Sequence, residues 1–157
     1  MNLAEIVNDN SPAYATKDQL AAVHERLRNV PAVPLPTRHY FAGGMYCREG
    51  LIPKDTLIVG KIHKTEHFIM VLIGRITVWT ENGKVELQAP YIGICPPGVQ
   101  RMGYAHEDTV FVNVHKTDKT DLAEVEADLV VDDPTSVYGV GNVIQQQIAV
   151  ESVKCLD

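Results

Sequence analysis

"GKIHKTEHFIMVLIG", residues 60–74, places His63, Glu66 and His67 within five residues, before a strongly apolar run that closes on a glycine. The run is rich in the β-branched and aromatic residues typical of strands. The side chains of the two histidines and the glutamate could be metal ligands, groups that bind a small molecule, or a polar turn between two strands. What the chain does depends on which of the three applies.

Similar short apolar segments continue from about residue 38 to residue 116, separated by Gly, Pro or Asn-Gly. The clearest hairpin signal is "ENGK" at 81–84, because Asn-Gly suits a type I′ turn. Many short strands at even spacing predict a β-sandwich or barrel and not an α/β fold. We therefore expect a mainly β fold over residues 38–116.

A helix is expected over residues 16–30, before the strands begin. Thr16 and Gln19 can form a capping box, in which each side chain accepts from the backbone N–H of the other. Apolar residues then recur at helical spacing, and a proline-rich segment, "PAVPLP", ends the helix and holds the chain extended. We expect this helix to lie across a sheet.

A second, shorter helix is expected over about 121–130, where apolar residues share one face and the acidic residues form a solvated face. The predicted division is therefore an arm and helix over 1–37, a barrel over 38–116, and a short helix with a tail over 117–157. Two apolar terminal segments, "LAEIV" and "VIQQQIAV", predict a homo-oligomer, a dimer or larger, in which the arm or the tail contacts a neighbouring barrel.

Composition limits the function classes. The 157 residues fit one domain, and a net charge of −6 argues against binding to a nucleic-acid polymer or an acidic membrane, which needs a basic face. The N-terminal "MNLAEIVNDN" has no signal-peptide pattern, and no apolar run reaches transmembrane length. Three cysteines without a C-x-x-C pair argue against a disulfide framework or a zinc knuckle, so a reducing, cytoplasmic location is expected.

A family resemblance rests on the segment that enters His63, turns and leaves to Gly74, and on "CPPGVQR" about twenty residues later. This arrangement resembles the RmlC-like cupin superfamily. The resemblance implies a cupin-like double-stranded β-helix, a jelly-roll barrel that carries a ligand or metal inside, with a flanking N-terminal helix and a short C-terminal helix. "GKIHKTEH", "PPGVQRMGYAHEDTV" and "VHKTD" are also similar to small cupin-like proteins encoded by tailed phages, which implies the host cytoplasm as location.

The cupin motifs are only partly present. The first motif has two histidines, a glutamate and a closing glycine; with Gly74 as that glycine, His67 takes the place of the glutamate, His63 that of the second histidine and Lys61 that of the first. In the second motif, Arg101 stands where the family has a histidine. The resemblance therefore implies that these four side chains point into the barrel.

Two of the four implied ligand positions are cations. Lys61 and Arg101 do not normally ligate a metal, and arginine offers a planar fork to carboxylates and phosphates. The sequence thus favours a binding protein that holds a small polar or anionic molecule, such as a nucleotide or sugar phosphate, without catalysis. In a phage setting this would be the sequestering of a host signal.

Two alternatives remain open. In the first, the chain is a metal-dependent enzyme, an isomerase, hydrolase or oxygenase, in which His63 and His67 bind a divalent transition metal with His115 as the third ligand. Glu66 or His106 could replace His115, and Glu66 could also act as a general base. In the second, the chain is a virion-associated structural protein.

For each of the remaining candidate ligand-binding residues, a purely structural role is an alternative to a functional one. Tyr104 and Trp79 either stack on a flat ligand or belong to the core. Arg101 either binds an anion or forms an internal salt bridge with Glu66 or Asp108. The predicted ligand-binding set is therefore Lys61, His63, Glu66, His67, Arg101, Tyr104 and Trp79.

Overall fold

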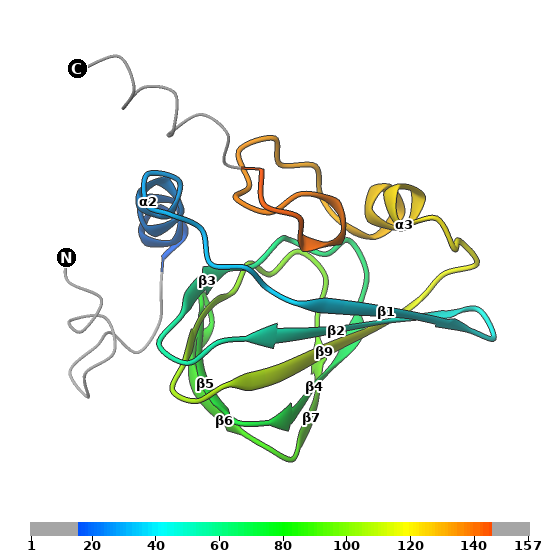
Figure 1. The fold of residues 1–157 in the computed structure, drawn as a ribbon, viewed down its shortest axis with the longest axis horizontal. Coiled ribbons are helices and arrows are strands. Elements are labelled where there is room, and N and C mark those ends of the chain that lie inside the picture. The colour runs from blue at the N-terminus through cyan, green and yellow to red at the C-terminus, as the bar shows by residue number, and fades with distance from the viewer. Residues whose placement is uncertain (1–15, 146–157) are drawn as a thin grey trace.

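The computed structural model describes residues 16–145, which form two antiparallel sheets and two helices (Figure 1). The five-stranded sheet has the order β1-β2-β9-β4-β7, and the four-stranded sheet has the order β3-β8-β5-β6. This confirms the predicted fold, which is a mainly β jelly roll with one helix before the strands and one after them in the sequence. The elements are α2 (Lys17–Leu27), β1 (Thr37–Ala42), β2 (Met45–Ile52), β3 (Leu57–Val59), β4 (His67–Ile73), β5 (Arg75–Thr80), β6 (Gly83–Gln88), β7 (Tyr91–Cys95), β8 (Met102–Ala105), β9 (Thr109–Lys116), α3 (Leu122–Leu129) and the 3-10 turn η1 (Val140–Asn142).

The core lies between the two sheets and follows strand alternation. On β5, Ile76 and Val78 face this core, where they pack with Ile69 and Val71 of β4 and Leu87 of β6. Because successive side chains of a strand point to opposite faces, the direct neighbours of Ile76 and Val78 on the strand face outward. The inner face of each strand can therefore be followed residue by residue to the site.

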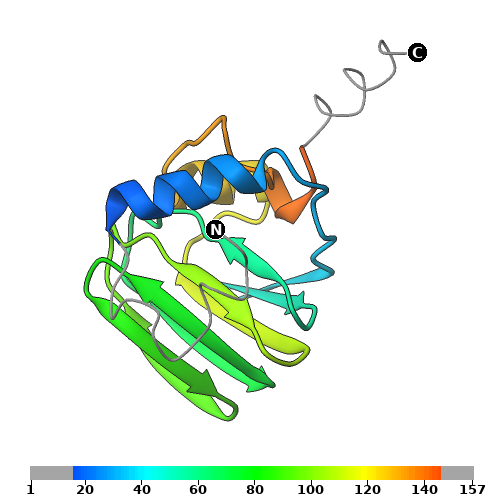
Figure 2. The same ribbon diagram turned by 90° about the vertical axis from the view of Figure 1, so that its left-hand side faces the viewer.

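The predicted capping box and first helix are confirmed. The Thr16 hydroxyl accepts from the Gln19 backbone N–H at 3.2 Å, and the Gln19 side chain accepts from the Thr16 N–H at 2.9 Å. Helix α2 lays Leu20 on the outer face of the four-stranded sheet, where it packs with Trp79 and Met102. Figure 2 shows this helix lying across one end of the strands, where it packs against the outside of the four-stranded sheet.

The "ENGK" segment forms the predicted hairpin between β5 and β6, but with a different turn. Thr80 pairs with Gly83, so the central turn residues are Glu81 and Asn82, and neither has a positive φ. A type I′ turn requires positive φ at both central positions. The hairpin prediction is confirmed, and the type I′ prediction is wrong because the turn lies one residue earlier.

Helix α3 closes one end of the barrel. Its Val125 and Leu129 are buried against Tyr46 of β2. The chain then crosses the same end through residues 131–145, where Tyr138 and Ile144 form an isolated bridge. The expected contacts of "LAEIV" and of most of "VIQQQIAV" lie outside the described residues.

Among residues 16–145, no helix is both long enough and apolar enough to span a bilayer.

Candidate functional site

A cavity of about 120 Å³ lies inside the barrel, at the end covered by residues 136–142. Most of its lining is apolar, supplied by Leu35, Ile52, Ile58, Ile76, Val78 and Phe111. The polar side chains from the barrel are Arg48, Lys61, His63, Arg101 and Asn113, while Ser136, Tyr138 and Asn142 come from the covering segment. The cavity thus combines apolar walls with a concentration of cations.

Neighbouring strands position these polar groups. Arg48 of β2 is paired in register with Asn113 of β9, and both continue the inner column that includes Gly50 and Phe111. Arg101 comes just before β8, whose inward-facing Gly103 also lines the cavity. Arg48 was missed from the sequence, although alternation from Ile52 places it inward.

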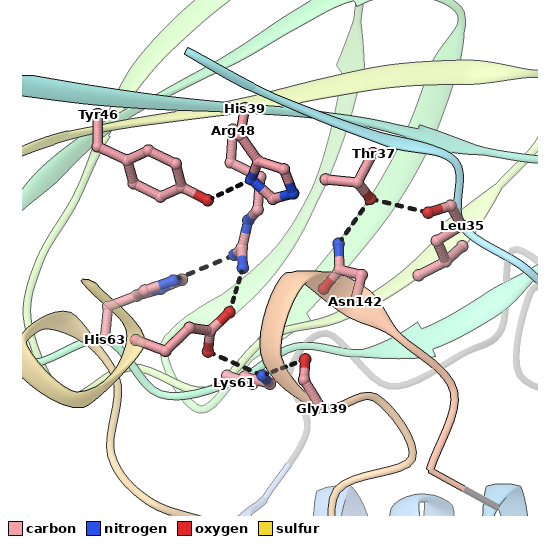
Figure 3. Close-up of polar contacts among 10 residues, drawn as sticks. Leu35, Thr37, His39, Tyr46, Arg48, Lys61, His63, Gly139 and Asn142 are labelled. Carbon is pink, nitrogen blue, oxygen red and sulfur yellow. Dashed lines mark hydrogen bonds and ion pairs between the residues drawn. The ribbon is translucent and has the colours of Figure 1, made fainter. Parts of the chain in front are cut away.

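One carboxylate from α3 balances two of the three cations (Figure 3). Lys61 Nζ lies 2.9 Å from one oxygen of Glu126, and Arg48 Nη1 lies 3.4 Å from the other. Lys61 also donates to the carbonyl of Gly139 at 3.0 Å. Glu126 was expected on a solvated face, yet its side chain is only 12% exposed, because α3 turns it toward the barrel.

Arg101 is the third cation, and within residues 16–145 it has no carboxylate within 4.0 Å. Its Nη2 donates to the Asn113 side chain at 3.5 Å, its guanidinium lies 5.7 Å from the centre of the Phe111 ring, and its Nη1 is buried without a hydrogen-bond partner. The salt bridge considered with Glu66 or Asp108 does not form: Glu66 is exposed, and Asp108 accepts from the Lys54 N–H. Burial lowers the pKa of Arg101, but a guanidinium stays charged in proteins.

Three histidines form a buried cluster beside the cavity. His63, His67 and His115 each offer a ring nitrogen, and these nitrogens lie within 4.8 Å of one another. Each ring has one buried nitrogen without a partner, namely Nδ1 of His63, Nε2 of His67 and Nδ1 of His115. From the sequence, these three residues were considered as the ligands of a metal, and the fold brings them together.

The histidines are neutral at neutral pH. Burial is the main cause that lowers the pKa of each ring, and it takes that of His115 to about 3. The nearby guanidinium groups of Arg48 and Arg101 lower these pKa values further, because a second positive charge is unfavourable there. Neutral imidazole is the form that binds a metal.

The outer contacts of the rings fit a metal only in part. His67 Nδ1 lies 3.1 Å from the carbonyl oxygen of Thr65, which fixes its proton there and leaves Nε2 free, as in most metal-bound histidines. His63 Nε2 instead lies 3.5 Å from Nη2 of Arg48, which can only donate. A transition metal therefore fits the donor set once His63 gives up the contact with Arg48.

The other predicted site residues lie elsewhere. Trp79 is buried on the outer face of the sheet beneath α2, and Tyr104 donates to Asp55 at 2.9 Å on that same face. His106, an alternative third ligand, pairs with Thr77 at 2.7 Å. Trp79 and Tyr104 were predicted to bind the ligand because they are aromatic. Strand alternation from Val78 and Gly103 places both side chains outside the barrel.

No family model matches the sequence, and no curated protein matches it. Solved structures similar to this chain include a cupin-2 domain containing protein from Shewanella frigidimarina, KdgF from a Halomonas species and the Cnp3 cupin domain of Schizosaccharomyces pombe. Their sequence identities are 15%, 12% and 18%, and their TM-scores are 0.44, 0.48 and 0.45. The matches cover 52%, 55% and 56% of this chain and 79%, 82% and 71% of theirs. At these identities and scores, the likeness assigns no site residue and no activity to this chain.

Proposed function

We propose that this chain is a cupin-like binding protein that holds a small carboxylate in its barrel, with the carboxylate on Arg101 and an apolar body against the walls. The observation that carries the proposal is the guanidinium of Arg101, which is buried, has an unpartnered Nη1 and has no carboxylate beside it among the described residues. A buried charge is costly unless it is paired, and an arginine fork matches a carboxylate.

The charge of the lining supports an anion. Arg48, Lys61 and Arg101 supply three positive charges, and Glu126 supplies one negative charge. Glu126 is shared by Arg48 and Lys61, so the surplus charge is not neutralised by the described part of the protein. A bound anion would offset this repulsion in a medium of low dielectric constant.

The size and walls of the cavity restrict the ligand. Its volume of about 120 Å³ is close to that of an apolar protein cavity of roughly 150 Å³ that holds benzene. A nucleotide or sugar phosphate, which is the ligand expected from the sequence, is larger than this cavity and more polar than its walls. The apolar lining favours a short aliphatic or aromatic acid instead.

Paired acids and amides test the proposal. Butyrate and benzoate are titrated by calorimetry against wild type, with butyramide and benzamide as neutral controls of the same shape. We expect binding of the acids alone, and a loss of about 2–5 kcal/mol in Arg101→Met, which keeps the length of the side chain but removes its charge. Arg75→Met is the matched control, because Arg75 pairs with surface carboxylates. Equal binding of acids and amides, or of both variants, would contradict the proposal.

The histidine cluster favours a second candidate, a metal-dependent cupin enzyme. Its support is the set of three unpartnered ring nitrogens on His63, His67 and His115. A divalent transition metal there would polarise an oxygen of a bound ligand. Metal analysis of purified protein tests this candidate, with His67→Ala and His115→Ala as variants and His106→Ala as control. Stoichiometric metal that is lost only in the cluster variants supports the enzyme, and wild-type protein without metal after incubation with zinc, nickel and iron excludes it.

A further inference from the structure

The outer face of the five-stranded sheet is apolar and exposed. Strand alternation places Phe68 and Met70 of β4 outward, because His67, which precedes Phe68, and Ile69, which lies between the two, are buried. On the edge strand β7, Ile92 and Ile94 are 68% and 62% exposed. A sheet face in water is normally polar, so this face is the unusual one.

Strand register joins these side chains into one continuous surface. Phe68 pairs with Ile94 on one side and with Val114 on the other, and Met70 likewise lies between Ile92 and Val112. On β2, Cys47 continues the first row beside Val114, whereas Glu49 ends the second row beside Val112. The apolar face thus extends across β7, β4 and β9 and ends on β2.

Neither described helix covers this face. Helix α2 packs with Trp79 and Met102 on the other sheet, and α3 packs with Tyr46 at the end of the barrel. In Figures 1 and 2 both helices lie along that end. The apolar side chains are therefore left without a partner in the described part of the protein.

The area suits a protein interface. The large apolar side chains that remain exposed on or at the rim of this face are Tyr40, Met45, Phe68, Leu72, Ile73, Ile92 and Ile94. At about half exposure, each leaves on the order of 100 Å² uncovered. Their sum approaches the roughly 800 Å² that each partner of a standard interface buries.

The charge of the face selects the kind of partner. The chain carries a net charge of −6, which opposes association between copies through most surfaces. On this face Arg38 and Glu49 neutralise each other at 2.6 Å, and Lys116 stands at the rim. A nearly neutral sheet face does not repel a second copy, and it lacks the basic surface that an acidic partner needs. Two such sheets can pack face to face about 10 Å apart.

We propose that two copies of this chain associate through the outer faces of their five-stranded sheets, packed face to face about a two-fold axis. The same surface of each copy then covers that of the other, so the contact closes as a dimer. This interface is separate from the cavity and does not depend on the proposed ligand.

Light scattering and sedimentation on the full chain test the dimer. We expect wild type to have twice the chain mass of 17.4 kDa, and Ile94→Glu and Phe68→Glu to be monomers. Val143→Glu is the matched control, because Val143 is 66% exposed but lies in the segment over the cavity, and it should stay dimeric. Circular dichroism checks the fold of each variant.

Ile92→Thr is a milder variant that keeps a β-branched residue in the strand. Its dissociation constant should rise about tenfold by sedimentation, which corresponds to the loss of buried apolar area. A monomeric wild type overturns the proposal whatever the variants do. So do folded Glu variants that remain dimers, or an unchanged dissociation constant in Ile92→Thr.

Discussion

Lys61 and Glu126, 65 residues apart in the chain, form an ion pair of 2.9 Å that ties the barrel to α3. The pair is almost fully buried, with side-chain exposures of 15% and 12%. Because Glu126 also contacts Arg48, one helix residue controls both the attachment of α3 and the charge of the cavity.

Glu126→Gln should therefore have two opposite effects. Removing one partner of a buried ion pair leaves Arg48 and Lys61 uncompensated, and the free energy of unfolding should fall by about 3 kcal/mol. The same change makes the cavity more positive, so the affinity for benzoate should rise. Urea unfolding and calorimetry measure the two effects. Glu86→Gln removes a surface partner of Arg75 and should cost less than about 1 kcal/mol, so equal losses in both variants would refute the prediction.

Gly74 closes β4 at a φ of +86°, where an added Cβ would lie 2.3 Å from the carbonyl oxygen of Asp108. Gly98 has a similar φ of +79°, but nothing lies within 4 Å of its added Cβ. Both alanine variants carry the cost of a left-handed conformation, about 1–2 kcal/mol, and Gly74→Ala carries the clash in addition. Thermal unfolding should show the larger loss of stability for Gly74→Ala, and an equal loss in both variants would contradict the close approach of Asp108 to Gly74.

Trp79 is the only tryptophan and is 1% exposed beneath α2. Trp79→Ala should lower the free energy of unfolding by about 3–5 kcal/mol, because it opens a space under Leu20. In the wild type, Trp79 fluorescence should be blue-shifted and should not change with benzoate. Strong quenching by the ligand would place the ligand near the outer face of the sheet instead.

The buried histidines predict loss of stability in acid. Unfolded histidine has a pKa near 6.5, and the folded values for His63, His67 and His115 are lower. Above pH 6.5 both states are neutral and these rings have no effect on stability. As the pH falls below 6.5, the unfolded chain takes up protons that the folded chain does not, and stability falls.

The expected slope is roughly 1.4 kcal/mol per pH unit for each ring that stays neutral. For His115 it continues to a pH of about 3. Urea unfolding between pH 7.5 and pH 5 measures the slope. His115→Gln should flatten it more than His106→Gln, whose ring is less buried. A stability that does not change over this range would contradict the burial of the three rings.

The fold was predictable because its signals are local. The capping box of Thr16 and Gln19 needs four residues, and the "ENGK" hairpin needs little more. Strand spacing then determined the class of fold. Only the turn type was wrong, because a shift of one residue in register leaves the sequence signal unchanged.

The site depends on information that local patterns do not contain. No local pattern joins Glu126 to Lys61, because their contact follows from how α3 docks on the barrel. Arg48 was missed for a related reason, since its inward direction depends on the phase of β2. Trp79 and Tyr104 show the converse: their chemistry suits a ligand site, but their place in the strands puts them on the outside.

The cover of the cavity also has a consequence for folding kinetics. Tyr138 donates to the carbonyl of Val33 at 2.6 Å, and Asn142 donates to Thr37 at 3.0 Å, each across 105 residues of chain. Contacts of such long sequence separation form late, because their loops are the most costly to close. A molecule that needs the finished cavity therefore meets no binding site in the folding transition state. Benzoate should slow the unfolding limb of the chevron and leave the refolding limb almost unchanged.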